Sequence, residues 1–161
     1  MMLASSSDFF VATAGAAAAL AGLIIVAMTV SVDRIITIPG MTSRAATAIG
    51  LLVAATVISL AGLIDQPAWA FGIEALVAAL AATALSIDSV VRVVSGRGAT
   101  TLGGALFKTG IGVVPAVLFG VGAVVVLSGM PGATVWIGIG SLFAIIVAVL
   151  NAWVLLVEIK R

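Results

Sequence analysis

Two residue types that do much of the chemistry of proteins, cysteine and histidine, are absent from this chain of 161 residues. Without cysteine there is no disulfide, no thiolate nucleophile, no lipid-modified cysteine and no cysteine-based metal site. Without histidine the chain lacks the commonest metal ligand and the commonest general base. We therefore expect neither a metal nor a cofactor.

Charged side chains are also scarce. They make up 8% of the residues, against roughly 25% in an ordinary globular domain. Apolar residues make up 63%, more than a water-soluble fold of this length could bury. The net charge of +1 comes from scattered basic residues, which excludes a nucleic-acid partner. The composition predicts one integral membrane domain over residues 1–161, with the lipid bilayer as its surroundings.

Five apolar runs predict an all-α bundle of five transmembrane helices, at residues 9–32, 45–64, 68–91, 109–130 and 133–157. The first has no charged residue before Asp33 and would be roughly 36 Å long, enough to cross a bilayer core of about 30 Å. It exceeds the apolar core of a signal peptide, so we expect it to remain in the mature protein. The run at 68–91 has the weakest support, because Glu74 and Asp88 bracket its core. Residues 92–108 are predicted to form a flexible loop.

The basic residues predict the orientation. They lie in the first predicted loop, the third predicted loop and the C-terminal segment: Arg34, Arg44, Arg92, Arg97, Lys108, Lys160 and Arg161. Because positively charged loops stay in the cytoplasm, the N-terminus is predicted outside and the C-terminus inside. Trp69 and Trp136 then lie at the outer interface and Trp153 at the inner one. We therefore expect a multi-pass membrane protein.

Small residues at helical spacing predict packing faces. In the first run they form a smooth stripe on which other helices should pack, while Ile24 and Ile25 should face lipid; the stripe is Gly15, Ala18, Ala19 and Gly22. In the last run small residues recur every four positions, at Gly140, Ala144, Ala148 and Ala152. Ala116 and Gly120 repeat the pattern in the fourth run. Such faces bind helices of the same chain or of another copy.

Four residues are candidate polar sites within the membrane: Glu74, Asp88, Asn151 and Pro115. Glu74 is either a cation or proton site or an interfacial acid reaching headgroups and water. Asp88 precedes Arg92 by four residues, so the two can form an ion pair on one helix. Asn151 forms an interhelical hydrogen bond or contacts a substrate. Pro115 leaves the carbonyl of Ile111 without its N–H donor and kinks the helix, which is either a tolerated bend or an ion-binding break.

No catalytic pattern is present in the sequence. There is no serine in a G-x-S-x-G frame, no phosphate-binding loop and no pair of acids with a basic partner. We therefore expect a non-enzymatic protein. It either acts through helix–helix contact on a membrane partner, including copies of itself, or forms an oligomeric channel or transporter for a small cation or proton.

Three segments show a family resemblance: DFFVATAGAAAALAGLIIVAMTVSVDRI at 8–35, IPGMTSRA at 38–45 and NAWVLLVEIKR at 151–161. They resemble small five-span membrane proteins of actinobacteria, which are often labelled modulators of the FtsH protease. The resemblance implies a multi-pass protein of the inner membrane. The protease modulator of that name has more spans, so no residue role is transferred from it.

Overall fold

The protein is all-α. In the computed structural model, residues 2–37, 41–94 and 102–159 are described, and side chains are described in this range except at 2–5, 34, 88–94, 102–111 and 158–159. Within these residues, the helices are α1 (Met2–Val30), α2 (Val32–Thr37), α3 (Met41–Ala61), α4 (Ala68–Val94), α5 (Leu102–Leu127) and α6 (Ala133–Ile159).

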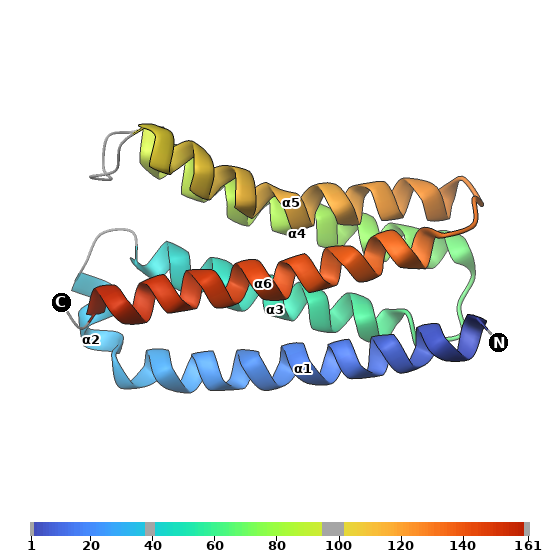
Figure 1. Cartoon of the computed structure of the whole chain (residues 1–161), viewed down its shortest axis with the longest axis horizontal. Coiled ribbons are helices and arrows are strands. Elements are labelled where there is room, and N and C mark those ends of the chain that lie inside the picture. Colours follow the sequence, from blue (N-terminus) through green and yellow to red (C-terminus); the bar gives the residue numbers. More distant parts are fainter. Residues whose placement is uncertain (1, 38–40, 95–101, 160–161) are drawn as a thin grey trace.

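The five long helices run side by side, with the N- and C-termini at opposite ends of the bundle (Figure 1). The short α2 lies at the end where α1 finishes. Helix α3 occupies the middle, because it packs against α1, α4 and α6. Helix α5 packs against α4 and α6, whereas α1 packs mainly on α3 and only slightly on α6. The first apolar run therefore lies at the edge of the bundle.

The apolar runs correspond to helices, with differences at their ends. Counting described residues alone, four helices contain stretches long and apolar enough to cross a membrane: Ser6–Val30, Met41–Ala61, Ala68–Ile87 and Ala133–Val157. The uncertain third run is thus one continuous helix, α4. In α5, the described apolar stretch is the shorter Gly112–Leu127. The fold is an all-α membrane bundle.

The predicted loop over 92–108 is wrong at both ends. Helix α4 continues to Val94 and α5 begins at Leu102, so helix replaces most of the expected loop. A backbone leaving the membrane remains hydrogen-bonded as helix even where its side chains become polar, and loss of hydropathy therefore does not mark the end of a helix. Arg97, Lys160, Arg161 and the Pro39-Gly40 turn lie outside the described residues.

The stripe predicted to pack in α1 faces outward. Gly15, Ala18, Ala19 and Gly22 are all exposed. Within the described part of the chain, a methyl group added at Gly15 or Gly22 would have no packing neighbour within 4 Å. The buried face of α1 is instead formed by Phe10, Thr13, Ala14, Ala17, Ala21, Ile24 and Met28. The prediction that other helices of this chain pack on the stripe is therefore wrong. Ile24 is also buried, whereas Ile25 is 46% exposed as expected.

The small residues of α6 face the interior. Gly140, Ala144, Ala148 and Ala152 are all buried. A methyl group added at Gly140 would lie 3.0 Å from Phe119 Cδ1, on α5. At Gly122, on the same interface, it would lie 2.5 Å from Ile137 Cγ1 and 3.3 Å from the backbone nitrogen of Ile137. At the α5–α6 contact, glycines therefore let the two helices approach closely, because they have no side chain.

Candidate functional site

Glu74 lies in the second turn of α4 and is half-buried. Its carboxylate accepts a hydrogen bond of 2.7 Å from Nε2 of Gln66, in the connection from α3. The same amide nitrogen donates to the carbonyl oxygen of Ala61, at the end of α3, over 3.0 Å. Gln66 thus joins the end of α3 to the side chain of Glu74. Asp65 is exposed and does not take part in these two bonds.

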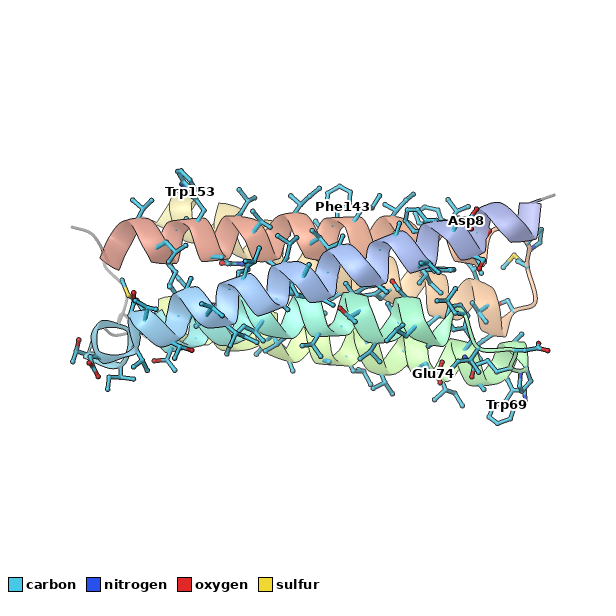
Figure 2. All side chains as sticks on the ribbon, turned by 90° about the horizontal axis from the view of Figure 1, so that it is seen from below. Asp8, Trp69, Glu74, Phe143 and Trp153 are labelled. Atoms are coloured by element: carbon cyan, nitrogen blue, oxygen red, sulfur yellow. The ribbon has the colours of Figure 1, made fainter. Side chains whose placement is uncertain are left out.

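Figure 2 shows Glu74, Trp69 and Asp8 at one end of the bundle and Trp153 at the other. The tryptophans are 63% and 67% exposed at positions 69 and 153. An indole prefers the interface between headgroups and hydrocarbon. Glu74 is therefore near one membrane surface, where a carboxylate costs far less than at the bilayer centre.

Pro115 is buried in the middle of α5, and the helix bends near its middle (Figure 1). The hydroxyl of Ser86, on α4, lies 2.9 Å from the carbonyl oxygen of Gly112 and 2.8 Å from that of Ala82. It therefore provides a donor to the α5 backbone one turn before the proline. Serine hydroxyls of neighbouring helices commonly satisfy backbone groups at such breaks. Sequence reasoning missed Ser86, although a serine within an apolar run is a signal for such a bond.

Asn151 is half-buried on α6. Its Nδ2 donates to the carbonyl oxygen of Val147, four residues earlier on the same helix, over 3.0 Å. The structure therefore shows an intrahelical bond where an interhelical one was expected. A side-chain donor one turn from a backbone carbonyl has a partner within reach at no cost in helix placement, which explains the difference. Asp88 and Arg92 both lie on α4, but their side chains are outside the described part of the structure.

Ser59, on α3, is the second polar residue that sequence reasoning missed. It is fully buried, and within the described part of the chain its hydroxyl oxygen has no hydrogen-bond partner. Other buried hydroxyls on these helices, including those of Thr13 and Ser141, donate to the carbonyl four residues earlier. Leaving a buried hydroxyl unpaired costs about 1–3 kcal/mol.

A groove of about 250 Å³ lies between α1 and α6. Its lining consists of Ser6, Phe9 and Phe10 from α1 and Thr134, Val135, Gly138, Ile139 and Leu142 from α6. The rings of Phe9 and Phe10 meet edge to face, with centroids 5.8 Å apart. A methyl group added at Gly138 would lie 2.9 Å from Cε1 of Phe9, so the glycine lets this ring lie against α6. Six of the eight lining residues are apolar.

In the part of the chain that the structure describes, Glu74, Ser86 and Asn151 thus lie apart, each bonded to a helix end, a bend or its own helix. The buried hydroxyl of Ser59 adds no bond to any of them. Among the described residues, no group of three or more acidic side chains lies close enough to hold a metal ion. The architecture defines the class: a small all-α membrane protein. No family model, curated protein or solved structure matches the chain.

Proposed function

We propose that this is a non-enzymatic membrane protein that acts by binding another membrane helix, from a second copy or from a different protein. The observation on which the proposal rests is the bare outward face of α1, formed by Gly15, Ala18, Ala19 and Gly22, which we call the α1 stripe. In lipid, helices gain little from burying apolar surface and associate through close packing. Small side chains permit that packing and also bring Cα–H groups near backbone carbonyls of the partner.

Many other exposed positions of the bundle carry bulky side chains, in contrast to the stripe. On α4 they include Val77 and Leu80, which are 59% and 62% exposed. On α6 they include Phe143 and Ile146. Bulky side chains of this kind interdigitate with lipid chains and hold a neighbouring backbone away. The α1 stripe is therefore the surface best suited to a partner helix.

Site-specific photocrosslinking in the host membrane tests this function. A photoreactive amino acid at Ala19 should give a discrete protein adduct, whereas the same residue at Val77 should give none. Co-expression of two differently tagged copies would show whether the adduct contains a second copy of the chain. Equal adduct yields at the two positions, or none at either, would contradict the proposal.

We also propose that the protein lies in the bacterial cytoplasmic membrane, crosses it five times and has its N-terminus outside. The basic residues on the described helices support this orientation, because positively charged segments stay in the cytoplasm. Each lies on the part of its helix that is at the opposite end of the bundle from Asp8 and Glu74: Arg34 on α2, Arg44 on α3, Arg92 on α4 and Lys108 on α5. Impermeant thiol reagents should label a cysteine at Ser7 on intact cells and leave one at Asp33 unlabelled. The reverse pattern would invert the orientation.

A further inference from the structure

We propose that the α1–α6 groove binds one acyl chain of a zwitterionic, amine-headed phospholipid from the leaflet at the N-terminal end of α1. The groove lies on the perimeter of the bundle, where the lining residues Val135, Ile139 and Leu142 are 59%, 36% and 45% exposed. It therefore opens sideways to the bilayer. A bound water needs two to four polar partners, and the deeper lining offers only hydrocarbon. Its natural occupant is hydrocarbon.

The lining of the groove changes from polar to apolar along its length, as a phospholipid does from its ester groups to its acyl chains. The two hydroxyl residues, Ser6 and Thr134, lie at the end of the groove near the helix starts. Leu142, eight residues after Thr134, lies about 12 Å further along the helix. A lipid whose ester region meets the hydroxyls and whose chain follows the groove inward therefore finds polar groups and apolar groups in the right order.

The floor of the groove is fixed before any lipid arrives. Phe10 is 2% exposed, and a methyl group added at Gly62 of the α3 end would lie 3.1 Å from its ring. Phe9 rests edge to face on Phe10 and against Gly138. The side chains that shape the site thus lose little freedom when a chain binds, which favours one bound lipid over random contacts.

Charge selects the headgroup. Asp8, the residue before the lining residue Phe9, is exposed, and Figure 2 shows it at the same end of the bundle as Glu74. Asp65 belongs to that end too, but it lies in the connection from α3 to α4 and not on α1. On the described helices the basic residues belong to the opposite end. An ammonium group is attracted to this end and a net negative headgroup is repelled. Phosphatidylethanolamine therefore fits better than phosphatidylglycerol.

The test uses the full chain in nanodiscs of equal parts phosphatidylethanolamine and phosphatidylglycerol, each in turn carrying a photoreactive acyl chain. Adducts are mapped by mass spectrometry. Phosphatidylethanolamine adducts at 134–142 should exceed those at the exposed positions of 143–153 by about threefold or more, because the groove surrounds the chain with contacts. Uniform labelling along α6 would overturn the proposal, because that result is expected of ordinary lipid contact or of a groove covered by protein.

Two matched pairs of variants complete the test. Ile139→Trp fills the groove and should reduce its adducts to the level of the surface, while Ile146→Trp, two turns away on the exposed face of α6, should leave them unchanged. Asp8→Asn should reduce the preference for phosphatidylethanolamine more than Asp65→Asn does, because Asp8 precedes the lining residue Phe9 whereas Asp65 lies in the connection from α3 to α4. Equal effects of the two tryptophan variants would overturn the site, and equal effects of the two aspartate variants would overturn its headgroup preference. If Ile139→Trp does not fold, the aspartate pair still tests the proposal.

Discussion

Replacing Gly122 and Gly15 by alanine should separate a helix contact inside the bundle from a surface that the chain leaves bare. At Gly122 the new methyl group would lie 2.5 Å from Cγ1 of Ile137 and 3.3 Å from its backbone nitrogen. The side chain of Ile137 must therefore shift, or α5 and α6 must move apart. Overpacking of this kind costs about 1–3 kcal/mol. At Gly15 the added methyl group would meet no packing neighbour within 4 Å among the described residues.

Both substitutions also change helix propensity, in favour of alanine by about 0.8–1 kcal/mol. Because this gain is common to the two variants, the difference between their free energies of unfolding equals the overpacking cost, about 1–3 kcal/mol. Unfolding by sodium dodecyl sulfate in mixed micelles, followed by circular dichroism, measures it. Equal stabilities, or a less stable Gly15 variant, would refute the placement of the two faces of the bundle.

Three further predictions concern polar side chains. Ser86→Ala removes the donor near the carbonyl of Gly112 and should lower the unfolding free energy by about 1 kcal/mol, as measured by the same titration; an unchanged value would dismiss the bond. Ser59→Ala removes a buried hydroxyl that has no partner among the described residues, and it should leave stability unchanged or raise it by about 1 kcal/mol. A loss of stability would reveal a hydrogen bond that the structure does not show. Glu74→Gln retains an acceptor for Gln66 and should cost about 1 kcal/mol at most, since the charge-assisted bond becomes a neutral one; liposomes with the wild-type protein should show no cation flux, and a flux abolished by this substitution would favour the channel.

Hydropathy was sufficient to predict the five long helices, though not their ends or the short α2, because a membrane core forces the backbone of an apolar run into helix. It was not sufficient to predict their faces. In α1, the buried positions Ala14, Ala17 and Ala21 and the exposed positions Gly15 and Ala19 are all small and apolar. In water, hydrophobicity separates the inside of a helix from its outside; in lipid both sides are apolar, so only the packing of the whole bundle decides.

The polar contacts show a similar division. Pro115 predicts a bend from its chemistry alone, and α5 bends near its middle. That Ser86 reaches the backbone beside it depends on how α4 and α5 are placed along each other, which no local pattern encodes. The bond between Gln66 and Glu74 likewise depends on the path of the connection between α3 and α4. Sequence therefore indicated where polar groups are needed, and the tertiary register determined which residues supply them.

The central claim is that the α1 stripe binds another helix. The most direct test compares the yield of the photocrosslinked adduct at Ala19 between the wild-type chain and a variant with both Gly15→Leu and Gly22→Leu. Among the described residues, no packing neighbour lies within 4 Å of a methyl group added at either glycine, so the variant should fold, whereas a helix packed on the stripe would be pushed away. Overpacking of about 1–3 kcal/mol corresponds to roughly a tenfold weaker association for each 1.4 kcal/mol. The account predicts that the discrete adduct falls at least several-fold while expression and unfolding remain as in the wild type; an unchanged yield of the same adduct would contradict it.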